Sequence, residues 1–531
     1  MQTVTENQPA AAPRPEPVPG GWARLSGVIG GMAGLAVADL VAWFLSPPGS
    51  PLSAVGELII SVLPASMIEF GKTTLGRADK PILLGIIALA VLLICALAGQ
   101  LEYRHRYRGA AVFGLLAAVA LVAVTLTPDK SPLSFLPAVV GLAAGYGILR
   151  LLLTRLQRWH PQRAAGPTDA ERAPVPGRRN FIGLAIVIGA ASVVAAVGSR
   201  ALAGAANAVS SARDRLKLPA AASPAPPVPA GADFGGSGLT SYVTPNQDFY
   251  RIDTALQVPV VDPDSWKLTI TGMVQNPVEI TFAELLAKPL VEHMVTLTCV
   301  SNEVGGELAG NALWLGFPVR ELLAEARPDP AADMVLSRSV DGWTAGTPLE
   351  VLTDQNRQCL LAVGMNGEPL PIEHGFPVRM VVPGLYGYVS ATKWVTELKV
   401  TTFKQDMGYW TPLGWSARGP IKLQSRIDTP RKSTIKAGRI VFAGVAWAQH
   451  TGIRGVEVRL DAGPWQQADL AETVGPDTWR QWRLEWQSAP GYHTVTVRAI
   501  DQNGTVQTDV KAPPDPDGAT GLHAITFIVE E

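Results

Sequence analysis

Uninterrupted apolar runs fill the first part of this 531-residue chain, whereas the rest alternates apolar and polar positions. A helix that crosses a bilayer needs about 20 consecutive apolar residues. The runs that we expect to span a membrane lie at residues 22–46, 81–100, 109–127, 133–153 and 181–206. The stretch 53–70 is shorter and carries two glutamates around a central proline, so we expect an interfacial or re-entrant helix there rather than a full span.

Arginines are concentrated in two of the loops between these runs, 102–109 and 154–180. Cytoplasmic loops of membrane proteins carry an excess of Lys and Arg. With five spans, both loops fall on the cytoplasmic side, the N-terminus lies inside, and everything after about residue 206 lies outside. A sixth span would put one of the two loops on the wrong side, so the pattern favours about five spans.

The last apolar run is preceded by paired arginines, in the sequence GRRNFIGLAIVIGAAS at 177–192. Arg178 and Arg179 followed by an apolar stretch resemble a twin-arginine export signal placed inside the chain. Ordinary positive-inside flanking explains the same residues, and the sequence leaves both interpretations open. Export of a folded protein would suit a chain that takes up a cofactor in the cytoplasm.

The expected spans contain few side chains suited to chemistry. None of the 7 histidines falls in one of them, so we predict no haem, and the spans would serve as an anchor or a docking platform. Asp39 is the main charged residue inside a span. An intramembrane carboxylate is a functional candidate by default, but we expect a polar contact between helices.

The segments that follow the spans differ from one another in pattern. Residues 207–238 are rich in Pro, Ala and Gly, which predicts an extended linker. Residues 239–427 mix alternating strands with short amphipathic helices, as in an α+β domain. Residues 428–531 hold short alternating strands at regular spacing, which predicts a β-sandwich for packing or dimerisation. With a disordered cytoplasmic tail at 1–21 and a membrane domain at 22–206, the fold class is multidomain.

Charge and cysteine content narrow the function classes. The formal net charge is −1, so nothing favours a nucleic-acid partner. The 3 cysteines cannot build a disulfide framework. Cys95 lies in an apolar run, which leaves Cys299 and Cys359 for the soluble part. The sequence leaves a bond between those two open.

Cys299 stands at the end of the strand pattern HMVTLTCV, shortly before Asn302 and two glycines. Strand ends deliver side chains to loops, where binding residues concentrate. The residues around Cys299 allow a nucleophile, a metal ligand, a disulfide half or a buried structural cysteine.

A second segment, 365–394, is dense in glycines and in donor side chains such as His374, Arg379 and Lys393. Such donors beside glycine turns suit an anionic ligand that carries a phosphate. Because no P-loop or G-x-G-x-x-G pattern occurs, nucleotide-binding folds are disfavoured.

This segment resembles the molybdopterin-binding core of the sulfite oxidase family in its HGFPVR block, its VVPG turn and the Lys–Trp pair that ends its loop. VTLTC followed by VSN resembles the family's strand that bears a molybdenum-ligating cysteine. TPNQDFYRID at 244–253 resembles the family's opening segment, and NALWLGFPVRELL at 311–323 resembles its helix entry. The resemblance covers 239–531 but not the membrane part, and it implies an immunoglobulin-like last domain.

The resemblance implies an enzyme that carries molybdenum–molybdopterin. Together with the apolar runs and the arginine-rich loops, it predicts an enzyme anchored in a bacterial inner (cell) membrane, with its catalytic domain on the outer face. Cys299 would be the thiolate ligand of the metal, and Arg251 would face the substrate oxyanion. Cys359, inside an apolar strand, would be structural. The residues implied in cofactor binding are Asn246, Tyr250, Cys299, Asn302, His374, Arg379, Ser390 and Lys393.

Some details depart from the sulfite-oxidising members of that family. Those members carry arginines shortly after the cysteine, whereas NEVGGELAGN here brings Glu303 and Glu307. A negative pocket edge disfavours sulfite. The loop GYVSATKW is one residue longer than in the animal enzymes, so Ser390 is a weaker assignment than Lys393. Tyr409 is the candidate for the tyrosine expected near the metal, with aromatic packing as the alternative.

The implied reaction is oxygen-atom transfer on a small sulfur or nitrogen oxide, in which the cofactor carries the difficult step. The alternatives are a reductase of sulfoxides such as methionine sulfoxide, a sulfite oxidase or dehydrogenase, and a scaffold that has lost its cofactor. Because no haem-binding segment is visible, electrons would be exchanged with an external cytochrome or a quinone-linked carrier. A homodimer through residues 428–531 is also implied.

Overall fold

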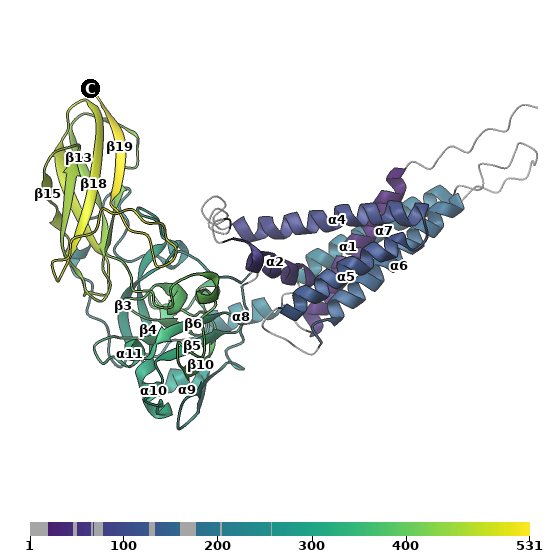
Figure 1. The fold of residues 1–531 in the computed structure, drawn as a ribbon, viewed down its shortest axis with the longest axis horizontal. Helices are drawn as coiled ribbons and strands as arrows, with labels where there is room; N and C mark the ends of the chain where they lie inside the picture. The colour runs from purple at the N-terminus through teal and green to yellow at the C-terminus, as the bar shows by residue number, and fades with distance from the viewer. Residues whose placement is uncertain are drawn as a thin grey trace, which may run out of the picture. The chain divides into compact units, whose positions relative to one another are not determined.

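The chain divides into two compact units, residues 1–204 and 205–531 (Figure 1). The computed structural model describes residues 20–45, 50–64, 67, 78–126, 133–159, 177–201, 204–255 and 258–531. The tail predicted at 1–21 lies outside this part, apart from its last two residues, which begin the first helix.

The first unit consists of apolar helices (Figure 1). They are α1 (Gly20–Leu45), α2 (Pro51–Val62), α4 (Asp79–Arg104), α5 (Arg108–Leu126), α6 (Leu136–Trp159) and α7 (Gly177–Ala201). Among the residues that the structure describes, 4 helices are long and apolar enough to cross a membrane, and they lie in α1, α4, α5 and α6. Four of the five predicted spans are therefore confirmed as apolar helices of spanning length.

The remaining two apolar stretches form shorter apolar helices. In α7 the apolar part is Asn180–Val194, so a span formed by α7 stays a prediction. α2 has 12 residues, fewer than the about 20 that a span needs. This length agrees with the prediction that the stretch 53–70 does not span the membrane. Most residues of that stretch after Pro64 lie outside the described part.

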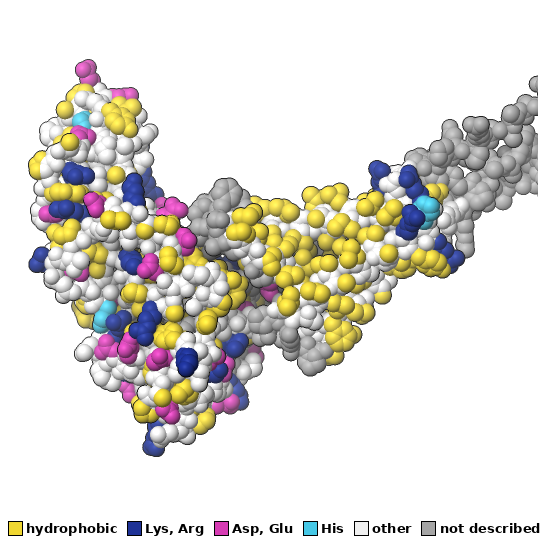
Figure 2. Space-filling model, in the orientation of Figure 1, with side chains coloured by type: hydrophobic (Ala, Val, Ile, Leu, Met, Phe, Trp, Pro, Cys, Tyr) yellow, Lys and Arg dark blue, Asp and Glu magenta, His cyan; other side chains and the backbone are white. Residues whose placement is uncertain are grey.

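α4 carries a stripe of large apolar side chains on its surface. Ile86, Leu89, Leu93 and Leu97 recur at a spacing of three or four residues, and each is more than half exposed. Figure 2 shows hydrophobic side chains over the surface of this helical unit. Such a face is unfavourable in water and suits hydrocarbon, in keeping with a membrane anchor.

Two carboxylates are held by polar contacts within the helical unit. Ser50, the residue before α2, donates its hydroxyl to Asp39 Oδ1 at 2.7 Å, which confirms a contact between helical segments for Asp39. The side chain of Glu102 is fully buried, and it accepts bonds from Arg150 Nη1 at 2.9 Å and from the Tyr146 hydroxyl at 3.1 Å. Glu102 also accepts backbone N–H groups at the start of α5. The sequence had suggested no role for it.

The second unit opens with α8 (Gly204–Arg215) and the predicted linker. The prediction of an extended linker is wrong for residues 207–215, which are helical in α8, whereas the rest is mostly extended. The extended part packs against the fold rather than acting as a free spacer. Ala222 N donates to Leu290 O at 2.7 Å, and Glu292 N donates to Ser223 O at 2.9 Å. The linker therefore runs along the start of the strand that leads to Cys299.

Two sheets and short helices build the segment predicted as α+β. One sheet has the order β2-β1-β10-β5-β6, and the other has the order β3-β4-β7-β8 with β9 beside β7. The strands are β1 (Lys267–Gly272), β2 (Val278–Thr281), β3 (Val291–Thr298), β4 (Ala309–Pro318), β5 (Met334–Ser339), β6 (Thr344–Pro348), β7 (Leu360–Met365), β8 (Glu368–Pro369), β9 (Arg379–Val381) and β10 (Val395–Thr401). The helices are α9 (Phe282–Ala287), α10 (Val319–Ala326) and α11 (Leu349–Thr353), with short 3-10 turns η4 (Ala230–Ala232), η5 (Asn246–Asp248), η6 (Ile372–His374), η7 (Gly387–Val389) and η8 (Thr411–Leu413).

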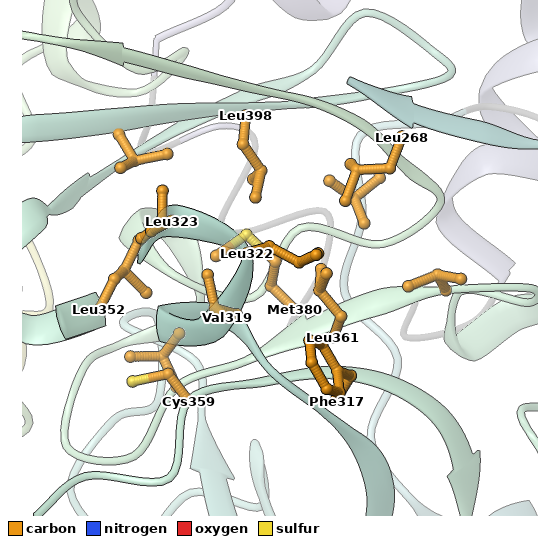
Figure 3. Packing of buried hydrophobic residues seen from close by; sticks show 14 of the residues in the cluster. Leu268, Phe317, Val319, Leu322, Leu323, Leu352, Cys359, Leu361, Met380 and Leu398 are labelled. Atoms are coloured by element: carbon orange, nitrogen blue, oxygen red, sulfur yellow. The ribbon is translucent and has the colours of Figure 1, made fainter. Parts of the chain in front are cut away.

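The core of this segment joins both sheets and α10 (Figure 3). Leu268 and Leu398 enter it from one sheet, Leu361 and Met380 from the other. Cys359 lies in the same core, and burial raises the pKa of its thiol to about 12. Cys359 is therefore a structural cysteine, as predicted. None of the three cysteines is in a disulfide, so the bond between Cys299 and Cys359 that the sequence left open is not formed.

The rest of the second unit is built from two further sheets. Their strand orders are β11-β13-β17-β16 and β12-β19-β18-β14-β15. The strands are β11 (Gln424–Thr429), β12 (Thr434–Lys436), β13 (Arg439–Trp447), β14 (Ile453–Leu460), β15 (Trp465–Gln467), β16 (Asp469–Leu470), β17 (Arg480–Gln487), β18 (Gly491–Asp501) and β19 (His523–Glu530). Phe442 and Trp482 of the first sheet share one core with Val456 and Phe527 of the second. The immunoglobulin-like character of this part stays a prediction, as do the predicted domain boundaries.

Candidate active site

Cys299 lies directly after β3, at the start of a loop that returns to β4. The backbone fixes it from both sides, because Cys299 N donates to Leu308 O at 2.9 Å and Cys299 O accepts Asn302 N at 3.1 Å. β3 itself is fully inside the fold from Met294 to Thr298. A buried strand and a closed turn therefore hold a half-exposed thiol in a defined place.

Asn302 closes the turn after Cys299. Its Oδ1 accepts Leu308 N at 2.8 Å. Its Nδ2 is buried and has no hydrogen-bond partner among the described residues. A Cβ at Gly306 would lie 2.7 Å from Asn302 Oδ1, so glycine is needed there for the asparagine to pack. A buried amide without a partner costs about 1–3 kcal/mol, which marks Nδ2 as a donor available to a ligand.

His374 is the second buried group that lacks a partner. Its Nε2 lies 3.3 Å from Asn246 O, whereas Nδ1 has no partner in the described part of the chain. Burial lowers the pKa of His374 to about 3, with the nearby cations Lys393 and Arg379 contributing to the same shift. The imidazole is therefore neutral at working pH and presents Nδ1 as a donor or an acceptor.

Arg379 begins β9 and lies beneath His374. Its Nη1 donates to His374 O at 3.1 Å, and its guanidinium lies 5.0 Å from the ring centre of Trp314. Burial lowers its pKa to about 10, so it keeps its charge. Gly375, at φ +114°, lets the chain pass over this arginine, because a Cβ there would lie 2.9 Å from Arg379 Cβ. A fixed, buried cation of this kind needs an anion nearby.

Lys393 and Arg251 share one carboxylate, that of Asp253. Lys393 Nζ lies 3.1 Å from Asp253 Oδ2, and Arg251 Nε lies 2.9 Å from the same oxygen. The Asp253 side chain is 6% exposed. Burial lowers the pKa of Lys393 to about 8, against the attraction of Asp253. Two cations therefore meet one buried anion, and Asp253 is a site residue to which sequence reasoning gave no role.

Tyr250 joins these groups to Cys299. Its ring stacks on Phe249 at 5.2 Å between centres. Burial raises the pKa of the Tyr250 hydroxyl, and the charge of a nearby Cys299 thiolate raises it further, against Arg379. Tyr386 is affected in the same way by burial and by Cys299. The thiol therefore sits among tyrosines and close to the cations.

Two predicted residues have their side chains engaged within the protein. Ser390 donates its hydroxyl to Tyr386 O at 2.8 Å. Asn246 Nδ2 donates to Met365 O at 3.2 Å, and Asn246 Oδ1 accepts Asn366 Nδ2 at 2.8 Å. Their roles toward a cofactor stay predictions. Tyr409 stacks edge-on against Trp410 at 5.2 Å, which is the aromatic packing that was the alternative for it.

The residues fit a flat, anionic, hydrogen-bonding ligand. Asn302 Nδ2 and His374 Nδ1 are buried polar atoms without a partner in the described part of the chain, and the heteroatoms of a pterin could satisfy them. Arg379 and Lys393 are buried cations that suit a phosphate. Cys299 forms no disulfide, and its thiol could bind a soft metal beside them. Two stretches far apart in sequence, 299–302 and 374–393, thus supply one coherent set of groups.

The part of the chain that holds these residues is similar in sequence to known proteins. The family model described as oxidoreductase molybdopterin binding domain matches residues 255–410. Human mitochondrial sulfite oxidase is 30% identical over 322 residues, which cover 51% of this chain and 58% of that protein. Sulfite oxidase of Arabidopsis thaliana is 28% identical over 325 residues, covering 52% of this chain and 81% of that protein.

A bacterial relative is covered almost completely. The uncharacterized oxidoreductase YuiH of Bacillus subtilis is 33% identical over 187 residues, which are 34% of this chain and 90% of that protein. Among solved structures, sulfane dehydrogenase SoxCD of Paracoccus pantotrophus has 23% identity and a TM-score of 0.47, covering 55% of this chain and 84% of that one. The chain spans 58% of the length of the human relative that it matches.

Proposed function

We propose that this chain, which belongs to the sulfite oxidase family of molybdopterin oxidoreductases, transfers an oxygen atom to or from a small, uncharged sulfur or nitrogen oxide. It is a molybdenum oxidoreductase. The observation that carries the substrate class is the pairing of Arg251 and Lys393 with the buried carboxylate of Asp253.

The cofactor residues follow from the site. Cys299 would supply the thiolate ligand, Asn302 and His374 would hydrogen-bond the pterin through the atoms that lack partners, and Arg379 and Lys393 would neutralise its phosphate. When bound, molybdenum–molybdopterin supplies two-electron oxygen-atom transfer. The protein's contribution is to hold the thiol, keep His374 neutral and place positive charge beside the phosphate.

The charge balance near the thiol supports an uncharged substrate. A dianion such as sulfite needs positive charge that is free to pair with it. Arg251 already directs its Nε and Nη2 at Asp253, with Nη2 lying 3.5 Å from Oδ1. The exposed Glu303 and Glu307 on the loop after Cys299 add negative charge. A sulfoxide or N-oxide avoids both conflicts, which favours the reductase direction.

Sulfite oxidation is the second candidate. It is favoured by 30% identity to human mitochondrial sulfite oxidase. Arg251 is its natural anion-binding residue, as the family resemblance implied. For this function Asp253 would have to release Arg251 when the substrate enters.

In either direction the electrons need a separate carrier. The apolar helices of the first unit are consistent with a membrane anchor. We place the second unit on the outer face of a bacterial inner membrane, where an external cytochrome or a quinone-linked protein would exchange electrons with it. A homodimer through residues 428–531 belongs to the same proposal.

A paired assay tests the proposed function. The full chain is purified in detergent and analysed for molybdenum, and steady-state rates are measured for dimethyl sulfoxide and trimethylamine N-oxide with reduced methyl viologen. Sulfite is measured with ferricyanide in parallel. We expect kcat/KM for at least one oxide to exceed that for sulfite. Faster sulfite turnover would establish the second candidate, and protein without molybdenum or pterin would establish a scaffold.

A further inference from the structure

β3, the strand that ends at Cys299, lies at the edge of its sheet. The sheet order β3-β4-β7-β8 leaves one side of β3 without a neighbouring strand in that sheet. Natural proteins pair, cover or charge such an edge. Here the linker pairs with the start of this edge, with Ser223 beside Val291, and residues of the C-terminal β-sheet region, 424–531, cover it further along. Thr296 N donates to Asp477 O at 2.9 Å, and Thr296 O accepts Gln449 Nε2 at 3.0 Å.

Gln449 brings this contact to within one residue of the thiol. The same Nε2 atom donates to Thr298 Oγ1 at 3.0 Å, and Thr298 directly precedes Cys299. Both side chains are buried. Trp479 N adds a bond to Thr296 Oγ1 at 2.7 Å. The end of the strand is therefore tied on its free side by groups that belong to the C-terminal region.

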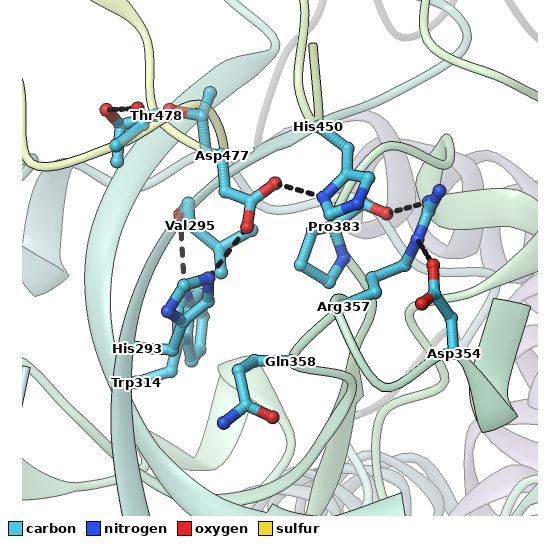
Figure 4. A network of polar contacts seen from close by, with 12 residues as sticks. His293, Val295, Trp314, Asp354, Arg357, Gln358, Pro383, His450, Asp477 and Thr478 are labelled. Atoms are coloured by element: carbon cyan, nitrogen blue, oxygen red, sulfur yellow. Dashed lines mark hydrogen bonds and ion pairs between the residues drawn. The ribbon is translucent and has the colours of Figure 1, made fainter. Parts of the chain in front are cut away.

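A carboxylate–imidazole bridge fixes the middle of the same edge (Figure 4). The Nε2 atom of His293, in β3, lies 2.7 Å from Asp477 Oδ2. The Nδ1 atom of His450, which follows β13, lies 3.0 Å from the other carboxylate oxygen, Asp477 Oδ1. The Asp477 side chain is 6% exposed. One buried carboxylate thus connects the cysteine strand to two loops of the C-terminal region.

The loop after Cys299 is held from the same region. Arg426 Nη1 donates to Gly306 O at 2.8 Å, and Arg426 is itself fixed by Asp428 Oδ1 at 2.6 Å. Gly305, at φ +83°, faces the ring of His523, where a Cβ would lie 2.4 Å from the ring. The strand before Cys299 and the loop after it therefore both contact residues 424–531.

We propose that the C-terminal region acts as a clamp that sets the position of Cys299, with Gln449 as its positioning residue. This inference rests on the proposed function, in which Cys299 is a molybdenum ligand. Groups that orient a metal ligand change metal affinity or activity by about 10–100-fold when they are removed. The clamp gives residues 428–531 a role in the site, beyond the packing or dimerisation expected from sequence.

The test compares two buried glutamines of the same region. Gln449→Met keeps the shape but removes both donors to β3. Gln424→Met is the matched control, because Gln424 Nε2 donates to Ala519 O at 2.7 Å and is likewise buried. Both are made in the full chain with Cys95→Ser and Cys359→Ser, so that iodoacetamide can alkylate only Cys299.

We expect Gln449→Met to alkylate about 10-fold faster than the parent in cofactor-free protein and, in loaded protein, to lose about 10–100-fold in kcat with little change in KM. Gln424→Met should change neither quantity. Equal alkylation rates in the two variants would overturn the clamp. If Gln449→Met does not fold, Thr298→Val, which removes the acceptor from the other side, must show the same acceleration.

The outcomes separate the clamp from the proposed function. Faster alkylation of Gln449→Met in a protein that never binds molybdenum would leave the clamp standing and remove the metal-ligand role of Cys299. Full molybdenum content and an unchanged molybdenum absorption-edge spectrum in Gln449→Met, with unchanged alkylation, would remove the clamp and leave the function standing.

Discussion

Arg251 and Asp253, two residues apart in the chain, form an ion pair, with Arg251 Nε 2.9 Å from Asp253 Oδ2. The same oxygen accepts Lys393 Nζ at 3.1 Å. The carboxylate thereby cancels charge on two cations that family resemblance assigns to the substrate and to the cofactor. We therefore expect this pairing to decide which anions the pocket can bind.

Replacing Asp253 with asparagine should open the pocket to anions. Arg251 then loses its counter-charge while keeping its position, and an interaction of about 1.4 kcal/mol corresponds to a tenfold change in affinity. We expect sulfate to inhibit Asp253→Asn about tenfold more tightly than the parent enzyme, with a smaller change in KM for an uncharged oxide. The control is Glu397→Gln on β10, which removes the partner of Arg338 on β5, since Arg338 Nε lies 3.2 Å from Glu397 Oε2. Equal sulfate inhibition in all three proteins would exclude a role for Asp253 in charge selection.

Replacing Cys299 with serine should abolish activity without unfolding the protein. A hydroxyl cannot replace a thiolate as a soft metal ligand, so we expect kcat to fall by more than about 100-fold and thermal unfolding to change little. Cys359→Ser is the control, because that thiol is protonated and donates to Val351 O at 3.4 Å, a bond that serine can also make. A Cys299→Ser enzyme with full turnover would show that the cysteine is not the ligand.

Asp477 should contribute stability that disappears in acid. Burial alone would raise its pKa, but hydrogen bonds from His293 and His450 outweigh burial and lower the pKa to about 2. Since the folded pKa lies below the ordinary value, the ionised carboxylate stabilises the fold above pH of about 4, and this contribution is lost as the pH falls toward 2. We expect Asp477→Asn to lower the free energy of unfolding by about 2 kcal/mol at pH 7 and by about half as much at pH 3.

Urea unfolding of the second unit within the full chain, followed by tryptophan fluorescence, measures this difference. A difference between Asp477→Asn and the parent that stays constant from pH 7 to pH 3 would contradict the assigned shift.

Glu102 should be the most sensitive polar residue of the helical unit. Removing one partner of a buried ion pair costs about 3–5 kcal/mol, because the other charge is left uncompensated. We expect Glu102→Ala to lower the melting temperature of the detergent-solubilised protein clearly, since Arg150 and Tyr146 lose their shared partner. Gln100→Ala, which removes an exposed bond to Arg24 Nε at 2.7 Å, should have little effect. Similar shifts for both variants would show that the Glu102 contacts contribute no more than a surface bond.

Much of the architecture could be predicted from the sequence because it depends on local pattern. Apolar length identified the helices of spanning length, and alternation identified the strands of the second unit. The capping box at Thr281 and Glu284 forms as its spacing indicates. Motif resemblance selected Cys299, His374, Arg379 and Lys393, all of which lie in segments that the fold brings to one place.

Other features depend on contacts between residues far apart in the chain, which no local pattern records. Asp253 lies in a segment quoted for its arginine, but its importance comes from Lys393, 140 residues away. In the sequence, Glu102 is one residue of an arginine-rich loop. The structure shows that it is buried and bonded to Arg150, 48 residues further along the chain.

The sequence by itself determined the kind of chemistry, because the residue types alone place a soft thiol, several cationic side chains and glycines at the positions that the family motifs require. Only the tertiary structure decided how that chemistry is held and toward what charge it is directed. Gln449 and Asp477 reach the cysteine strand across more than 150 residues, and Asp253 cancels charge only because folding buries it between Arg251 and Lys393. Hydrogen bonds and ion pairs act over a few ångströms in space, so their partners are fixed by packing and not by order along the chain.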